Sequence, residues 1–251
     1  MFRGLGTVVN VATVVVGSGI GVLLGHRLPQ RTRDTVTDAL GLVTLLIAGL
    51  SATAVTDRVL TDAVGADAPV LIVLGSLLIG GIAGSLLRIE DRLEGFGGWL
   101  RDRLAGSSAA GSQTSRHRFI EGFVTASLVF CVGPLTVLGS LSDGLGNGSQ
   151  QLLLKAALDG FASIAFAASL GIGVMASALA VLCVQGSLTL LGAALGSFVP
   201  QAHLLALTAT GGLLLAGVAL RLLQVRQVPV GDLLPALLVA PVLTELVVAL
   251  H

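Results

Sequence analysis

The sequence has 251 residues, of which 54% are hydrophobic and only 11% are charged, and its formal net charge is zero. A soluble domain carries about 25% charged residues, so this composition excludes an ordinary soluble protein. The mean hydropathy of +0.95 indicates a polytopic membrane protein. The balanced charge gives no indication of a nucleic-acid partner.

Apolar stretches of about 20 residues predict membrane spans, because a helix of that length crosses the bilayer core. Eight such stretches occur in chain order: residues 5–25, 37–55, 69–87, 119–141, 153–174, 176–197, 203–222 and 231–250. The predicted fold class is therefore all-α, with about eight transmembrane helices. The first stretch is too long for the core of a signal peptide, so we expect a retained span.

The fifth and sixth stretches are hard to separate, because residues 160–199 contain no charged side chain. The main alternative to two full spans is a broken or re-entrant pair of helices within residues 153–199. Freed backbone groups are tolerated at membrane depth only where protein covers them or where they line a cavity.

The segment that follows the third span differs from a simple connection. Apolar residues recur there at three- and four-residue steps, which predicts an amphipathic helix over residues 89–105 at the inner membrane surface. A Ser/Gly/Ala-rich linker over residues 105–115 follows, and its composition is typical of a flexible chain. The loop after the second span, "TDRVLTDAVGAD", is acidic.

The arginines predict the orientation, because basic residues concentrate on the cytoplasmic side. An outside N-terminus and an outside C-terminus leave only Arg3, Arg58 and Lys155 outside. The other basic residues then all lie in inner loops: Arg27, Arg31, Arg33, Arg88, Arg92, Arg101, Arg103, Arg116, Arg118, Arg221 and Arg226.

Glycines recur at four-residue steps in three spans, which places them on one helix face and allows close approach of helix backbones in lipid. These glycines are Gly17, Gly21 and Gly25, then Gly80 and Gly84, then Gly192 and Gly196. The pattern predicts tight packing within one chain or, as the alternative, a homo-oligomer contact.

Weak internal repeats relate the spans to one another. "EGFVTASLVFCVG" at residues 121–133 matches "DGFASIAFAASLG" at residues 159–171, which pairs the fourth span with the fifth. "GVLLGHRLPQ" from Gly21 matches "GAALGSFVPQ" from Gly192. "DALGLVTLLIAGL" from Asp38 matches "TATGGLLLAGVAL" from Thr208. We therefore pair spans one to three with spans six to eight.

The paired spans run in opposite directions in the predicted topology. This arrangement is typical of the inverted repeats of secondary transporters. It predicts a single transmembrane domain over residues 1–251, with one repeat half at 1–141 and the other at 153–251.

Two acids open the matched fourth and fifth spans. Ionisable residues inside a membrane are expensive and mark functional sites. In each span a hydroxyl residue follows one turn later, and a Gly-Pro or Gly-x-Gly step interrupts the helix further on. The predicted solute or ion site comprises Glu121, Thr125, Gly133, Pro134, Asp159, Ser163, Gly171 and Gly173.

Structural explanations exist for several of these acids. Glu121 fits an interfacial position near Arg118, where the helix dipole favours an acid. Asp159 fits an ion pair with Lys155 one turn earlier. Asp38, Asp232 and Glu245 are weaker site candidates, and helix capping explains Asp38 and Asp232 equally well.

Enzyme chemistry is not expected. The four histidines and the two cysteines lack the spacing of metal ligands, so we expect no metal and no cofactor. A phosphate-binding G-x-x-x-x-G-K-S/T loop is missing from the sequence, which disfavours ATP-driven pumping by this chain alone. "VPVGD" lacks the first glycine of the G-x-G-D loop of aspartyl proteases, so an intramembrane hydrolase is disfavoured too.

Five segments carry a resemblance to a known family: "GLGTVVNVATVVVGSGIGVLLGHRLPQR", "LLRIEDRLEGFGGWL", "FIEGFVTASLVFCVGPLTVLGSLSDGL", "ALDGFASIAFAASLGIG" and "VGDLLPALLVAPVL". Together they resemble the DUF 554 family of multipass bacterial inner-membrane proteins, over nearly the whole chain. The resemblance implies an inner-membrane location and supplies no substrate, catalytic residue or partner.

The residues therefore have to indicate the function. The paired acids and the inverted repeat favour a secondary transporter or narrow ion pathway for an unknown small solute or ion. The alternative is a membrane assembly or interaction protein, which a packed and dry seam between the repeats would favour. Membrane lipids, and a homo-oligomer through the glycine faces, are the expected partners.

Overall fold

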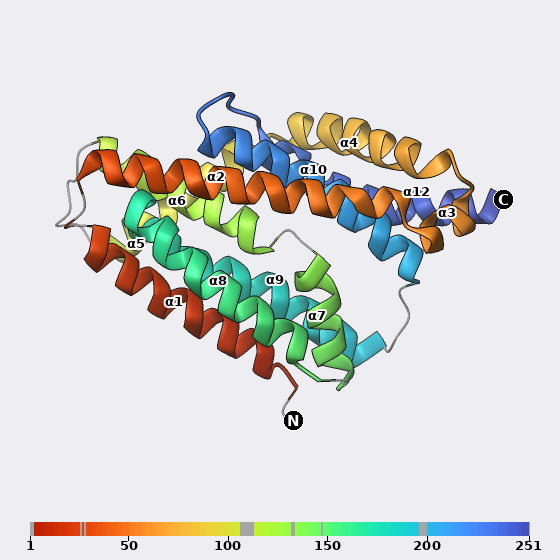
Figure 1. Ribbon diagram of the computed structural model, residues 1–251, viewed down its shortest axis with the longest axis horizontal. Helices are drawn as coiled ribbons and strands as arrows, with labels where there is room; N and C mark the ends of the chain where they lie inside the picture. Colours follow the sequence, from red (N-terminus) through yellow and green to blue (C-terminus); the bar gives the residue numbers. More distant parts are fainter. Residues whose placement is uncertain are drawn as a thin grey trace. The chain divides into compact units, whose positions relative to one another are not determined.

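The computed structural model describes residues 3–25, 27, 29–105, 113–131, 134–146, 148–195 and 200–250. Every regular element in these ranges is a helix (Figure 1), which confirms the predicted all-α class. In chain order the helices are α1 Leu5–Gly25, α2 Gln30–Ala52, η1 Thr53–Thr56, α3 Arg58–Val64, α4 Ala68–Leu87, α5 Ile89–Ala105, α6 Gln113–Cys131, α7 Pro134–Leu145, α8 Gln150–Leu170, α9 Gly173–Leu195, α10 Gln201–Leu222, α11 Val230–Leu233 and α12 Ala236–Leu250.

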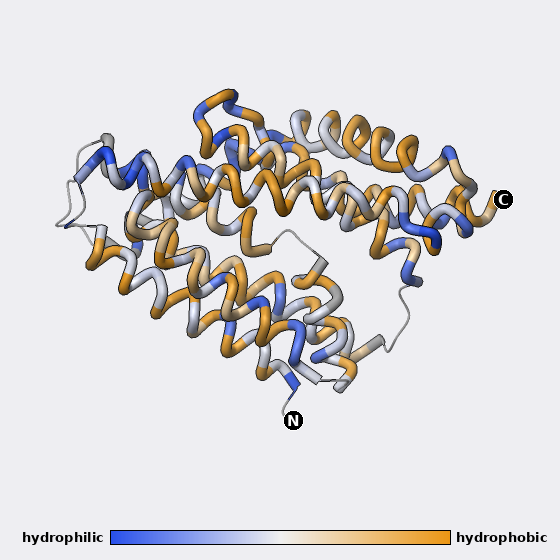
Figure 2. The backbone as a smooth tube through the Cα atoms, viewed as in Figure 1, coloured by the Kyte–Doolittle hydropathy of each residue, from blue (hydrophilic) through white to orange (hydrophobic). Residues whose placement is uncertain are grey.

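Seven segments of the described chain are long and apolar enough to cross a membrane: Leu5–Gly25, Gln30–Thr56, Ala68–Leu87, Gln150–Leu170, Gly173–Ala194, Gln201–Leu222 and Val230–Leu250. The predicted fourth span is instead a helix pair, α6 and α7, bent by 75°. Apolar residues dominate the long helices, while hydrophilic ones gather near some ends, such as the start of α2 (Figure 2). Leu23, Leu86 and Leu190 are 71%, 81% and 72% exposed, as expected of lipid-facing side chains.

Of the two predicted interruptions, the one between α6 and α7 lies within a span, and the one at Gly171 does not. Helices α8 and α9 are both full-length, so the alternative of a broken pair within residues 153–199 is wrong. Gly171 is the reason: its positive φ of 86° ends α8, and α9 begins two residues later. The Gly171–Gly173 step is therefore a turn between two spans and not an interruption within one.

Two compact units make up the chain. The first contains Met1–Leu40, Arg92–Cys131 and Leu135–Ser197, and the second contains Gly41–Asp91, Val132–Pro134 and Phe198–His251. Each unit combines segments from both predicted repeat halves. The division of a single domain into halves at residues 1–141 and 153–251 stays a prediction.

In the first unit, α1 lies alongside α8 and runs parallel to it (Figure 1). A Cβ added to any of three glycines of α1 would collide with a backbone carbonyl of α8. The pairs are Gly17 with Gly160, Gly21 with Ile164, and Gly25 with Ala168. This glycine face therefore packs within one chain, as the four-residue spacing predicted.

Helices α6 and α7 together run the length of the first unit. Gly122 in the middle of α6 packs against Leu170 at the end of α8. At the other end, the Gly6 backbone N–H at the start of α1 donates to Asp143 Oδ2 of α7 at 3.0 Å. The second half of α6 together with α7 thus extends from the end of α8 to the start of α1.

In the second unit, α4 packs against α11 and α12 in the opposite direction. A Cβ at Gly80 or Gly84 would collide with the backbone of Ala236 or Asp232, respectively. A buried apolar cluster joins α3, α4, α10 and α12 and comprises Leu60, Val64, Ile72, Ala202, Ala206 and Ala240. The second glycine face is thus also occupied by the same chain.

The segment predicted to be an amphipathic helix at residues 89–105 is α5. Leu100 is buried, while Phe96 and Trp99 are exposed. Residues 106–112 of the predicted linker lie outside the described residues, and residues 113–115 belong to α6.

The path of α6 and α7 generates a topology test. Single cysteines replace the exposed residues Arg31, Asp62, Arg116 and Gln150 in a background whose two native cysteines are alanine. A membrane-impermeant thiol reagent is expected to label positions 31 and 116 from one side and positions 62 and 150 from the other. Labelling of positions 116 and 150 from the same side would show that the bent pair is re-entrant.

Candidate functional site

A buried ion pair lies on α8 in the first unit. Lys155 and Asp159 are four residues apart, so both side chains lie on one helix face, and Lys155 Nζ contacts Asp159 Oδ2. Only 6% of Lys155 and 7% of Asp159 are exposed. The ion pair considered from the sequence is therefore present, and each charge compensates the other inside the span.

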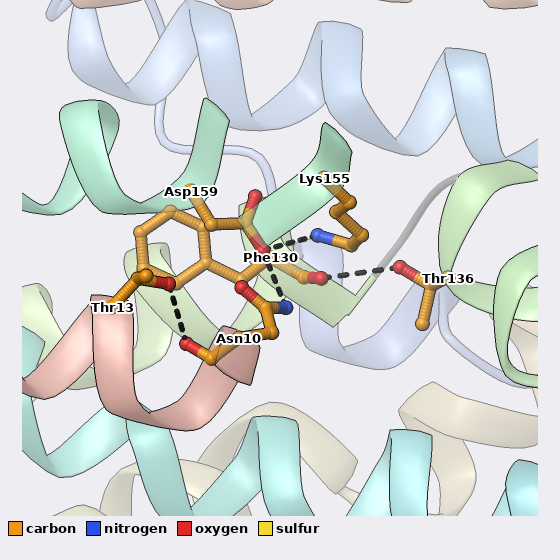
Figure 3. A network of polar contacts seen from close by, with 6 residues as sticks. All are labelled: Asn10, Thr13, Phe130, Thr136, Lys155 and Asp159. Atoms are coloured by element: carbon orange, nitrogen blue, oxygen red, sulfur yellow. Dashed lines mark hydrogen bonds and ion pairs between the residues drawn. The ribbon is translucent and has the colours of Figure 1, made fainter. Parts of the chain in front are cut away.

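Asn10 of α1 adds a second partner to Asp159. Its Nδ2 donates to Asp159 Oδ2 at 2.9 Å, and Asn10 is completely buried. Figure 3 shows Asn10 and Lys155 reaching the same carboxylate from two different helices. The close approach of α1 and α8 through their glycines makes this contact between the helices short enough.

Thr13, one turn after Asn10, donates its hydroxyl to the Asn10 carbonyl at 2.9 Å. This contact ties the side chain to the α1 backbone. Asn10 was not among the predicted site residues, although an amide within the apolar run "TVVNVATVVV" is the signal that marks it.

Two oxygen atoms of this network have acceptor capacity left. Asn10 Oδ1 is buried and has no hydrogen-bond partner in the described chain. Both recorded bonds to Asp159 end on Oδ2, so Oδ1 has no bond within the described residues. Carboxylate and amide oxygens accept hydrogen bonds and bind hard cations, and a carboxylate can also take up a proton. The network therefore has the chemistry of a small-cation or proton site.

The bend between α6 and α7 is stabilised from inside the chain. Pro134 has no backbone N–H, so the Phe130 carbonyl four residues earlier loses its helical donor. Thr136 replaces that donor, because its hydroxyl donates to the Phe130 carbonyl at 3.2 Å (Figure 3). Gly133, the predicted partner of Pro134, lies outside the described residues.

The structure does not bring Glu121 to Asp159. Glu121 is half-buried, and its neighbour Gly122 packs against Leu170. At a rise of 1.5 Å per residue, Leu170 lies about 16 Å along α8 from Asp159. The two acids therefore belong to opposite ends of the α6–α8 contact, and Asp159 alone has the network described above.

The remaining predicted residues of this group have identifiable structural contacts. Ser163 donates its hydroxyl to the Gly160 carbonyl at 2.8 Å, and Thr125 is buried within α6. Gly173 allows α9 to start directly against the Phe119 backbone, where a Cβ would collide.

A second polar cluster lies in the second unit and includes Asp232. The Asp232 Oδ1 atom accepts from the Glu90 backbone N–H at 2.9 Å, so it caps the start of α5. The Glu90 carboxylate pairs with Arg221 and accepts from the Gly231 backbone N–H. Asp232 therefore has a structural role as a helix cap, as considered from the sequence. The helix that it caps is α5 and not its own helix, α11.

The other two weaker candidates lie at the surface. Glu245 Oε2 is 2.9 Å from His203 Nε2, but the Glu245 side chain is 68% exposed. Asp38 is exposed on α2. Neither is buried as Asp143 and Asp159 are, at 3% and 7% exposed. Within the described residues, no group of three histidine, cysteine or acidic side chains is placed to hold a metal ion.

Comparison with known proteins agrees with this membrane architecture. Residues 5–245 match the family described as "Protein of unknown function (DUF554)". The chain belongs to the DUF554 family.

Relatives of this DUF554 chain include two bacterial proteins. It is 30% identical to "Uncharacterized membrane protein YdfK" of Bacillus subtilis (strain 168) over 237 residues, which is 94% of each chain. It is 28% identical to "Uncharacterized protein YqgA" of Escherichia coli (strain K12) over 236 residues, again 94% of each. No solved structure matches the chain. The family and the apolar helices make this DUF554 chain a membrane protein.

The buried pair generates a prediction about stability. Lys155→Met leaves the Asp159 charge without its ammonium partner, and breaking a buried ion pair in this way costs about 3–5 kcal/mol. The double variant Lys155→Met/Asp159→Asn removes both charges and is expected to recover most of that loss. Thermal unfolding of the purified variants in detergent measures the difference. A double variant no more stable than Lys155→Met would contradict the compensation.

Proposed function

We propose that this chain is a secondary transporter or narrow ion pathway for a small cation or cation-coupled solute, with Asp159 at its binding site. The supporting observation is the buried Lys155–Asp159–Asn10 network between α1 and α8. Charged groups within spans are costly and are typical of substrate, ion and proton pathways. The proposal assigns no catalytic residue, cofactor or metal to the chain.

Lys155 has a specific role in this proposal. Its ammonium is a tethered cation on the carboxylate that a transported cation or proton would use. A cation that binds Asp159 therefore competes with Lys155, and the displaced ammonium then requires a new environment. Such competition couples occupancy of the site to a rearrangement around α8.

The contacts between predicted repeat mates support an inverted repeat. Sequence matches relate three pairs of spans, and the third and eighth spans form the fourth predicted pair. Each pair packs in opposite directions within its own unit. The start of α1 meets the end of α9, where the Thr7 and Thr189 hydroxyl oxygens are 3.3 Å apart. Helix α6 opposes α8, α2 opposes α10, and α4 opposes α11 and α12. Helices related by a twofold axis in the membrane plane run in opposite directions, as these pairs do.

The proposed location is the bacterial inner membrane, with both termini outside. The path of α6 and α7 through the first unit supports an even number of crossings, which places the two termini on the same side. The distribution of arginines favours the outside for both. Lipids are the expected surroundings, and a homo-oligomer stays a prediction.

A membrane assembly or interaction protein is the second candidate function. The observation that favours it is the Lys155–Asp159 ion pair itself, because a satisfied pair can serve helix packing alone. In that case neutral side chains of similar shape are expected to preserve every property of the protein.

Cation flux distinguishes the two functions. Reconstituted vesicles are tested for Na⁺, K⁺ and proton flux with the wild-type chain and with the neutral variant Lys155→Gln/Asp159→Asn. The variant keeps the shape of Asp159, places a neutral polar side chain at position 155 and removes both charges, so it is expected to fold and to lose at least 90% of the flux.

The matched control is Asp38→Asn, which removes the charge of an exposed acid on α2 and is expected to retain full flux. Monodisperse size-exclusion profiles establish that all three proteins are folded. Wild-type flux in the folded neutral variant would reject the role of Asp159.

A further inference from the structure

A cavity of about 310 Å³ lies at the end of the first unit opposite the N-terminus of α1. The end of α1, the start of α2, the start of α6 and the turn between α8 and α9 surround it. Its lining includes Val22, Arg33, Arg118, Phe119, Leu170 and Ile172. The cavity thus combines two guanidinium groups with apolar walls.

The charge of this cavity has one sign. Arg33 and Arg118 are its charged lining residues, and no acid is among the described residues that line it. Neither arginine forms an ion pair within the described chain. Arginine stays protonated in proteins, so the lining carries two positive charges and no negative charge among its described residues. Such a site disfavours cations and favours an anion.

The two arginines also have donors available. Arg118 Nη2 donates to the Ser169 carbonyl at 2.8 Å, which accounts for one of its five N–H groups. Arg33 Nε is buried and has no hydrogen-bond partner in the described chain. A buried donor without a partner costs free energy, and an anion with several acceptor oxygens removes that cost.

Ser169 positions both arginines. Its carbonyl accepts from Arg118, and its hydroxyl donates to the Arg33 backbone carbonyl at 3.1 Å. Capping of the α8 C-terminus explains why a cation stands at Arg118. Helix capping does not explain the position of Arg33, because its side chain forms no hydrogen bond with α8 within the described residues.

We propose that this cavity is a binding site for a phosphate group, held by the Arg33 and Arg118 guanidiniums. The planar forks of arginine match the oxygens of phosphate, and two positive charges suit its negative charge. The apolar walls of Val22, Phe119 and Leu170 would contact the less polar part of a phosphate-bearing molecule. Both a phospholipid headgroup and a soluble phosphate compound present this chemistry.

The test uses the full chain purified in detergent, with binding measured for two probes. Inorganic phosphate is titrated by calorimetry, and phosphatidylglycerol is titrated by native mass spectrometry. We expect Arg33→Gln to weaken binding of the bound probe at least tenfold. The Arg33 side chain forms no hydrogen bond within the described residues, so this variant removes none of their hydrogen bonds and is expected to fold.

Arg31→Gln is the matched control, because Arg31 lies in the same first turn of α2 but is exposed and does not line the cavity. We expect it to bind within twofold of the wild type. Binding of inorganic phosphate identifies a soluble ligand, and binding of phosphatidylglycerol alone identifies a lipid; either supports the site if Arg33→Gln weakens it.

Absence of binding for both probes, or equal binding by Arg33→Gln and the wild type, would overturn the proposal. The site shares no residue with the Lys155–Asp159–Asn10 network, and its test measures binding and not flux. A negative binding result would therefore not contradict the proposed transport function. A negative flux result would likewise not contradict the phosphate site.

Discussion

A carboxylate inside a membrane span must find its partners within the protein, and Asp159 imposes this requirement on the unit built around α8. Lys155 supplies the charge from one turn away, and Asn10 supplies an amide from α1. The amide reaches Asp159 because glycines allow the α1 and α8 backbones to touch. The hydrogen bond from Asn10 to Asp159 therefore depends on the close packing of α1 and α8. A larger residue at Gly17 would push Asn10 away from the carboxylate.

The same helix carries both proposed sites. Asp159 lies in the body of α8, and Ser169 lies in its last turn, about 15 Å further along. The two sites would bind ligands of opposite charge. The Asp159 site offers oxygen atoms and a displaceable ammonium to a cation, whereas the cavity beside Ser169 offers two guanidiniums to an anion. Lys155 and Asp159 compensate each other, whereas the described lining of the arginine cavity contains no acid. Movement of α8 on displacement of Lys155 would alter both.

Much of the fold follows from the sequence because apolar length is a direct signal. The all-α class, the long spans and the helix at residues 89–105 were predictable on this basis. The Gly-Pro step also marked the bend between α6 and α7, since proline removes a donor whatever its surroundings. Gly171 was misjudged, because the same residue type ends a helix or interrupts it, and its φ decides which.

The site was only partly predictable. Asp159 and its ion pair with Lys155 were accessible because both signals lie within one helix turn. Asn10 was missed because its role depends on contact between α1 and α8, which no local pattern reveals. Glu121 was paired with Asp159 from a repeat, but a repeat relates two helices without stating where along their length they meet. Glu90 and Arg221 are far apart in sequence and were missed for the same reason as Asn10.

The central claim is that the Asp159 network lies on a pathway and is more than a packed seam. Its most direct test is the accessibility of a cysteine in place of Asn10, in a chain whose native cysteines are alanine. A small membrane-impermeant thiol reagent is applied from each side of the membrane in turn. The account predicts modification from both sides, with a rate that changes when Na⁺, K⁺ or the pH gradient is varied. A cysteine at position 10 that stays unmodified from both sides under all these conditions would contradict it.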